Sequence, residues 1–179
     1  SINRTHEILS SVLNIPLATG TIKNMVTRCA ESLKDTYEQI RLKMITLGLI
    51  HCDETGSCVD GKTCWVHVAS DQNYTYLTIN QKSGQAGMDA ANVLPHANGI
   101  IMHDCWNSYW KYQNVTHAIC CAHLLRELNG VIENHPEQTW AVRFKKLLLD
   151  MKKVRDKALL LDKDEVSYYH RHKFDLQTV

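Results

Sequence analysis

Apolar positions in the first 50 residues repeat at the spacing of an α-helix. Between residues 22 and 44 they follow one another mostly at steps of three or four, which predicts one helix of about six turns. Thr19 or Thr21 is placed to cap its start, and Gly48 lies just beyond its end. A shorter helix is predicted over residues 6–13, so the chain opens with a helical segment.

This helical opening allows two interpretations. A short helix, a turn and a second helix resemble a helix-turn-helix, which would place Lys23, Asn24 and Arg28 against DNA. The same pattern is typical of a helical hairpin that packs on the domain that follows. Both interpretations stay open at this point.

From Leu47 onward the pattern changes to short apolar runs separated by turn residues. The first run, over residues 49–53, ends in Asp53, and Thr55-Gly56 predicts a turn directly after it. Two more strands are predicted over residues 63–68 and 74–79, with turns at Gly61 and at residues 71–73. Three consecutive strands joined by tight turns predict an antiparallel meander.

The second half of the chain returns to helices after two more strands. A helix is predicted over residues 84–91, and it is followed by an apolar run over residues 100–104 that ends in Asp104. A strand is predicted over residues 116–120, and the chain reads as helical from Ala122 almost to residue 179.

This order of elements indicates the fold class. A meander followed by a crossover to a strand beside the first strand is typical of a ribonuclease-H-like α/β fold. We therefore expect a mixed sheet, with an antiparallel three-strand meander plus parallel strands. The expected domains are a helical lead-in over residues 1–46, an incomplete ribonuclease-H-like core over 47–134, and a truncated helical insertion or tail over 135–179.

Composition narrows the class of protein. The 179 residues carry a net charge of +1 and 44% hydrophobic residues, which is typical of an ordinary globular chain. No run approaches the roughly 20 apolar residues that a membrane helix needs, so we expect a soluble, cytoplasmic protein without a membrane partner. Seven cysteines without a C-x-x-C pair favour reduced thiols over a structural zinc site.

Asp53 and Asp104 form the candidate catalytic pair. The predicted strand order places them at corresponding ends of adjacent strands, where two carboxylates repel each other unless a cation lies between them. Mg²⁺ prefers such oxygen ligands, and a pair of Mg²⁺ or Mn²⁺ ions supports phosphoryl displacement. The alternative is that Asp53 is only a turn residue and that Asp104 only caps the next element.

Three blocks of sequence follow one another along the chain: Asp53-Glu54-Thr55-Gly56 with Trp65-Val66-His67-Val68, then Gly87-Met88-Asp89-Ala90 with His103-Asp104-Cys105-Trp106-Asn107-Ser108-Tyr109, then Cys121-Ala122-His123-Leu124-Leu125-Arg126-Glu127-Leu128. Together with Ala18-Thr19-Gly20-Thr21-Ile22-Lys23-Asn24 in the helical opening, they resemble the blocks of bacterial insertion-sequence-66 family transposases, in the same order over nearly the whole chain. One block alone would be weak, whereas the ordered set is specific.

The resemblance implies a DDE-type transposase that cuts and joins DNA with Mg²⁺ or Mn²⁺ at a two-metal site. Asp53 would be the first catalytic acid and metal ligand, and Asp104 the second. The third acid of the family, a glutamate in an Asn-Asn-x-Ala-Glu-Arg-like motif, is absent from residues 1–179. We therefore expect a catalytic-core fragment whose intact parent acts on transposon ends and target DNA and self-associates.

Further residues have candidate roles around the acids. Arg126, near the start of a predicted helix, is placed to hold a phosphate, although an ion pair with Glu127 would explain it equally well. His103 and His123 are expected behind the metal ligands rather than on the metal. The remaining candidate DNA contacts are Lys62, Lys82, Lys23 and Arg28.

Two other functions compete with the transposase interpretation. One is a non-catalytic DNA-binding or assembly module derived from a transposase. The other is a stand-alone ribonuclease-H-like nuclease that recruits an acid from the tail.

Overall fold

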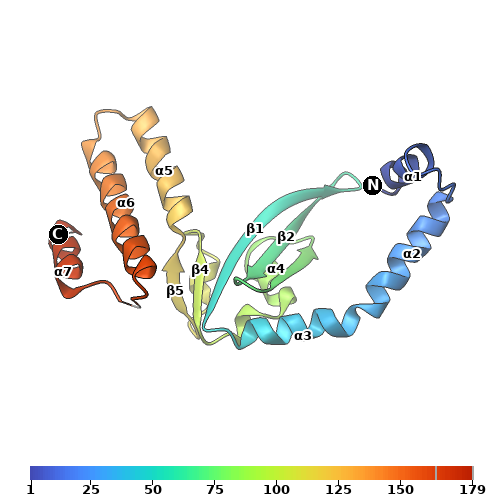
Figure 1. Cartoon of the computed structure of the whole chain (residues 1–179), viewed down its shortest axis with the longest axis horizontal. Helices are drawn as coiled ribbons and strands as arrows, with labels where there is room; N and C mark the ends of the chain where they lie inside the picture. The colour runs from blue at the N-terminus through green and yellow to red at the C-terminus, as the bar shows by residue number, and fades with distance from the viewer. Residues whose placement is uncertain (164, 179) are drawn as a thin grey trace. The chain divides into compact units, whose positions relative to one another are not determined.

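The computed structural model describes residues 1–163 and 165–178, and the elements follow the chain as shown in Figure 1. Two compact units are present. The first comprises Ser1–Ile101 and Asn107–His117, and the second comprises Met102–Trp106 with the described part of 118–179. Residues 164 and 179 of the predicted tail lie outside the described residues.

Three helices make up the lead-in: α1 (Ile2–Ser11), α2 (Thr19–Ser32) and α3 (Lys34–Ile45). The prediction of one helix over residues 22–44 is wrong, because the helix breaks at Leu33. Capping by Thr19 or Thr21 is also wrong, since α2 starts after Ala18 without a side-chain cap. Helix α3 is held on the sheet by Tyr37, whose hydroxyl donates to the carbonyl of Leu77 at 2.8 Å.

The meander consists of β1 (Leu49–Val59), β2 (Lys62–Ser70) and β3 (Thr75–Asn80), each antiparallel to the next. The predicted turn at Thr55-Gly56 is wrong, because β1 continues through both residues and Gly56 pairs with Trp65. The chain reverses at Asp60 and Gly61 instead, with φ values of 49° and 74°. Two positive φ angles are what a tight two-residue hairpin turn requires, and Asp-Gly supplies them.

The rest of the sheet confirms the predicted fold class. Helix α4 (Gly84–Ala91) and the short helix η1 (Leu94–His96) lead to β4 (Ile100–His103), and η2 (Tyr109–Lys111) leads to β5 (Thr116–Ile119). The five strands lie in the order β3-β2-β1-β4-β5. Backbone bonds from Thr116 N to Gly99 O and from Cys120 N to His103 O advance both strands together, as in a parallel pair. This mixed sheet has the ribonuclease-H-like order.

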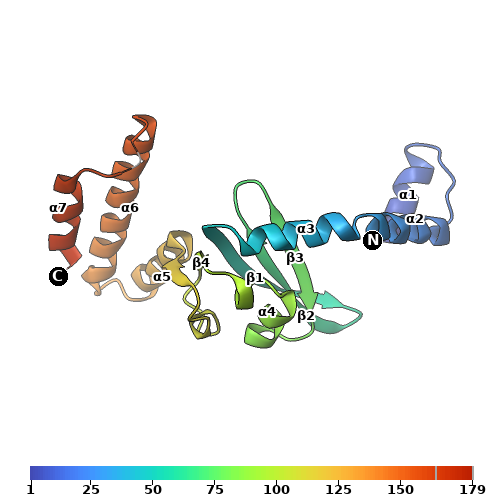
Figure 2. The ribbon, with the colours of Figure 1, turned by 90° about the horizontal axis from the view of Figure 1, so that it is seen from below.

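The core of the first unit lies between the meander and α4 (Figure 2). On β1, β2 and β3 the residues Cys52, Ala69 and Tyr76 are buried, and Met88 of α4 is buried against them. Strand side chains alternate between two faces, so the other face of the meander, which carries Asp53, Val68 and Leu77, points away from α4. We call these two sides the covered face and the open face.

The second unit contains the helices α5 (Cys121–Asn134), α6 (Thr139–Leu160) and α7 (Tyr168–Thr178). The prediction of helix from Ala122 almost to the end is confirmed in type, but the segment is divided into three helices rather than one. Leu128 of α5 and Ala141 and Leu147 of α6 are buried within this unit. None of the helices in the described part of the chain has the length and apolar character needed to cross a membrane.

Candidate active site

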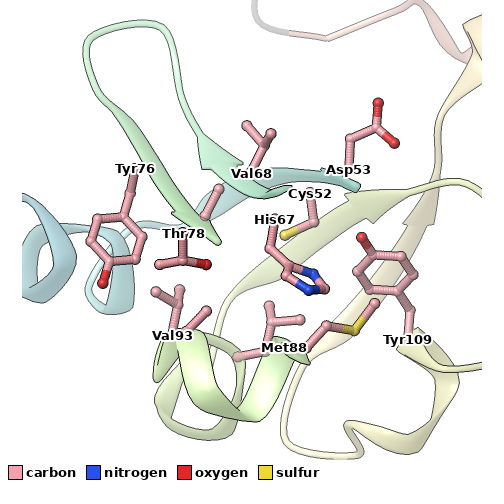
Figure 3. A pocket seen from close by; sticks show the side chains of 12 residues that line it. Cys52, Asp53, His67, Val68, Tyr76, Thr78, Met88, Val93 and Tyr109 are labelled. Atoms are coloured by element: carbon pink, nitrogen blue, oxygen red, sulfur yellow. The ribbon is translucent and has the colours of Figure 1, made fainter. Parts of the chain in front are cut away.

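Asp53 lies in the interior of β1, where its side chain is exposed on the open face. Figure 3 shows the carboxylate pointing away from the ring of His67 on the covered face. The expectation that Asp53 ends its strand is therefore wrong, because β1 runs on to pair with β2 as far as Val59. One carboxylate oxygen, Oδ1, accepts a hydrogen bond from the backbone N–H of Glu54 at 2.9 Å.

Asp104 follows directly after β4 and is half-buried. Its Oδ1 accepts a hydrogen bond from the backbone N–H of Trp106 at 3.1 Å. His103, the last residue of β4, is fully buried, as expected for a side chain on the face opposite to Asp104.

The two aspartates share one local arrangement. Each has one oxygen held by a backbone N–H, and neither Oδ2 has a hydrogen bond to another of the residues in 1–163 and 165–178. Carboxylate oxygens that keep a lone pair available suit a hard divalent cation, so the donor chemistry fits Mg²⁺. Within the same described ranges, no three His, Cys, Asp or Glu side chains converge on one point.

Behind Asp53, three polar side chains form a row across the covered face. Glu54 of β1 pairs with His67 of β2, and His67 pairs with Thr78 of β3. The side chains of Glu54 and His67 are only 8% and 6% exposed, and Oε2 of Glu54 lies 3.2 Å from Nδ1 of His67. We call Glu54, His67 and Thr78 the polar row; it replaces the apolar residues normally found under a helix.

His67 is held tightly within this row. Its Nε2 lies 3.4 Å from the carbonyl oxygen of Lys82, and α4 passes so close that a Cβ on Gly87 would stand 2.2 Å from the same nitrogen. Burial lowers the pKa of His67, and the Lys82 carbonyl partly opposes this shift. Which ring nitrogen of His67 carries a proton depends on the tautomer, and the contact with Glu54 is attractive only when a proton lies between Nδ1 and Oε2.

A cavity of about 20 Å³ lies beside His67, walled by residues that include Cys52, Met88 and Tyr109 (Figure 3). A space of this size holds about one water molecule. Burial, together with the nearby charge of Asp53, raises the pKa of the Cys52 thiol to about 12. All seven cysteines lie in the described ranges, and all are free thiols.

The four candidate DNA-binding residues of the first unit are all exposed and come from different elements. Lys62 begins β2 beside the hairpin turn, and Lys82 lies between β3 and α4. Lys23 and Arg28 are both on α2, but five residues of helix separate them by about 140° around the axis. Arg28 shares a shallow groove with Thr21 and Asn24 instead.

Arg126 and His123 belong to α5 in the second unit. Arg126 is exposed in the second turn of the helix. His123 is partly buried, and its Nδ1 has no hydrogen-bond partner among the residues that the structure describes.

Glu54 and His67 were not predicted as site residues. The signal was nevertheless present, because a two-residue turn at Asp60-Gly61 determines which residues of the hairpin face each other. Each pair has residue numbers that add up to 121, so Glu54 must lie opposite His67. The incorrect turn at Thr55-Gly56 concealed this pairing.

The chain resembles a known family along almost its whole length and known structures along about half of it. A family model described as Transposase IS66 family matches residues 1–177, whereas no curated protein matches. Among solved structures, the HTLV-2 integrase catalytic core domain in complex with magnesium, in its dimeric form, is 14% identical with a TM-score of 0.35; the match covers 50% of this chain and 74% of that one. A chain of the intasome of simian T-cell lymphotropic virus in complex with PP2A regulatory subunit B56 gamma is 13% identical, with a TM-score of 0.33. That match covers 49% of this chain and 42% of the intasome chain.

Proposed function

This chain belongs to the transposase IS66 family, and we propose that Asp53 and Asp104 are two of the catalytic acids of its DDE core. The core of such a transposase is a polynucleotidyl transferase, which cleaves DNA strands and joins them to new partners. In this proposal the two aspartates bind the divalent cation on which the reaction depends.

One observation supports this pair above other acids in the chain. Asp53 and Asp104 each occupy the fifth position counted from the first residue of their strands, Leu49 and Ile100. These two strands are neighbours in the sheet, and a backbone bond from Ile100 N to Gly48 O starts them at the same level. Because the two strands start at the same level and each aspartate is the fifth residue from that start, the positions of Asp53 and Asp104 favour a shared site.

Asp53 and Asp104 are the residues that would hold Mg²⁺ or Mn²⁺, each through the oxygen that accepts no backbone hydrogen bond. Such ions, when bound, neutralise the charge that develops on the attacking and leaving oxygens of a phosphoryl transfer. The protein's own contribution is to orient both carboxylates in advance, because the N–H groups of Glu54 and Trp106 restrict their rotation.

DNA is the proposed partner, as transposon ends and as target, with self-association of the intact enzyme in the bacterial cytoplasm. Arg126, Lys62, Lys82 and Arg28 are the proposed phosphate contacts, because all four are exposed cations. Lys23 is a fifth proposed contact, on a different side of α2 from Arg28. His103 and His123 are proposed to support the site from behind, without binding metal.

The proposal is tested by strand cleavage with the transposase that carries this chain, on duplexes that bear the ends of its element. Asp53→Asn or Asp104→Asn should each reduce Mg²⁺-dependent cleavage by about a thousandfold or more, because each removes a charged metal ligand. Binding of the duplex, measured by gel shift in EDTA, should stay within about threefold of the wild type, since the phosphate contacts are unchanged.

The matched control is Asp60→Asn, at an exposed aspartate of the same hairpin. Asparagine tolerates the positive φ at this turn, so cleavage should be unchanged. Wild-type cleavage by Asp53→Asn or Asp104→Asn would exclude the metal assignment. Unchanged binding with no metal-dependent cleavage by the wild type would favour a non-catalytic DNA-binding module instead.

A further inference from the structure

The orientation of the Asp53 carboxylate depends on the residue that follows it. Its Oδ1 is bound to the backbone N–H of Glu54 at 2.9 Å, so any displacement of the Glu54 peptide group is transmitted to the carboxylate. Asp53 itself is exposed, and water offers no fixed geometry in place of that hydrogen bond.

Glu54, in contrast, is anchored on the covered face. Its side chain is 92% buried, and its carboxylate meets Nδ1 of His67 at 3.2 Å, directly across the β1–β2 pair. His67 is fixed in turn by the Lys82 carbonyl at its Nε2 and by the close backbone of Gly87. A continuous series of contacts therefore runs from α4 through His67 and Glu54 to the open face.

Stability alone does not account for this arrangement. A buried pair of a carboxylate and an imidazole loses hydration that two apolar side chains of similar size would not lose, so such pairs are often neutral or unfavourable for folding. Buried polar groups behind a metal ligand have a known use, since they orient the ligand and their loss weakens metal binding by about 10- to 100-fold.

We propose that Glu54 and His67 are positioning residues that hold the carboxylate of Asp53 in the orientation that binds the divalent cation. This inference rests on the proposed role of Asp53 as a metal ligand. Neither residue touches the cation: His67 restrains Glu54, and the N–H of Glu54 restrains Asp53.

The test measures binding of Mn²⁺ alone to the full 179-residue chain, by electron paramagnetic resonance of the free ion, without DNA. Glu54→Gln and His67→Ala should each raise the dissociation constant for Mn²⁺ about tenfold. His67→Gln, whose amide N–H can donate to Glu54, should restore part of the affinity. A role in folding alone would instead lower the unfolding midpoint and leave the Mn²⁺ affinity of the folded chain unchanged.

Thr78→Val is the matched control, because Thr78 is the third member of the polar row but its hydroxyl makes no hydrogen bond to another described residue. It should bind Mn²⁺ within about twofold of the wild type, since the outer-shell contacts of Asp53 are kept. Circular dichroism establishes that each variant is folded. Should Glu54→Gln fail to fold, the Mn²⁺ affinities of His67→Ala and His67→Gln decide whether the positioning role holds.

Asp53→Asn separates the two possible failures. If this variant weakens Mn²⁺ binding while folded Glu54→Gln, or the two His67 variants, bind like the wild type, the positioning role is overturned and the metal-ligand role of Asp53 stands. If Asp53→Asn itself binds Mn²⁺ like the wild type, the metal-ligand role fails, and the positioning role fails with it.

Discussion

The covered and open faces of the meander each depart from the usual burial pattern, at different positions. Under α4, where apolar residues are the rule, the polar row places Glu54 and His67 at 8% and 6% exposure. On the open face, Leu77 and Ile79 of β3 are 51% and 63% exposed. Two polar side chains are thus buried and two aliphatic side chains exposed on the same three strands, although Ile50 and Ala69 are buried in the usual way.

These exceptions to the usual burial pattern indicate that the two faces serve different requirements. Burying polar groups costs free energy unless they are paired, so the covered face was not optimised for stability alone. Asp53 lies on the open face directly beside Glu54 in the chain, and it is the residue to which the polar row is connected. The following predictions test this difference, beginning with the largest expected effect.

Replacing His67 with leucine should cost about 3 kcal/mol of unfolding free energy, because the buried Glu54 carboxylate loses the imidazole 3.2 Å away. The double variant Glu54→Leu with His67→Leu should recover most of that loss, since both buried polar groups are then replaced together by apolar ones. Urea denaturation at constant m-value measures both. A double variant that is less stable than His67→Leu would show that the polar row stabilises the fold.

Gly87→Ala should cost about 2 kcal/mol, because the new Cβ would stand 2.2 Å from His67 Nε2 and 2.3 Å from the Lys82 carbonyl oxygen. Gly20→Ala in α2 is the control, as nothing lies within 4 Å of its Cβ position. That control should be neutral or stabilising in the same urea titration. Equal stability of the Gly87 and Gly20 variants would refute the close approach of α4 to His67.

At the hairpin tip, Gly61→Ala should cost about 1 kcal/mol, because alanine is strained at a φ of 74°. The effect is smaller than at Gly87 because no neighbouring atom lies within 4 Å. Thermal unfolding is sufficient to detect it, and Gly61→Asn, which tolerates positive φ, should recover part of the loss. An alanine variant as stable as the wild type would contradict the turn assignment.

On the open face, Ile79→Thr and Leu77→Thr should change the unfolding free energy by less than about 0.5 kcal/mol, since exposed positions contribute little. Threonine keeps the preference for strand at both positions. Urea denaturation of each variant provides the measurement. A loss above 1.5 kcal/mol would mean that these side chains are packed against something, and the contrast between the faces would disappear.

Most elements could be predicted because turn-forming residues separate them. Gly61 and residues 71–73 lie between the strands they were expected to separate, and the order of the strands in the meander follows from them. The break at Leu33 was not predictable from spacing, because Leu33 itself continues the helical apolar pattern. What sets α3 apart is tertiary: Tyr37 packs on Tyr76 and bonds to Leu77, whereas α2 buries only Ile22.

For the candidate site, the two aspartates were found by sequence, but the setting of Asp53 was not. Thr55-Gly56 has the composition of a turn, yet here Gly56 lies within a strand opposite Trp65, whose ring would stand 3.9 Å from a Cβ at this position. The local preference of Thr55-Gly56 for a turn could not show that β2 would pair with these two residues. With the reversal placed at Asp60-Gly61 instead, the pairing of Glu54 with His67 follows from numbering alone.

The tight turn at Asp60-Gly61 also restricts which insertions and deletions the hairpin of β1 and β2 can tolerate. Losing a single codon from one arm of this hairpin would slip the pairing by one position and turn Asp53 toward α4. Losing one codon from each arm would keep Asp53 on the open face and Glu54 opposite His67. Insertions and deletions inherited between Glu54 and His67 are therefore expected to occur in matched pairs, in any descendant whose enzyme still moves DNA.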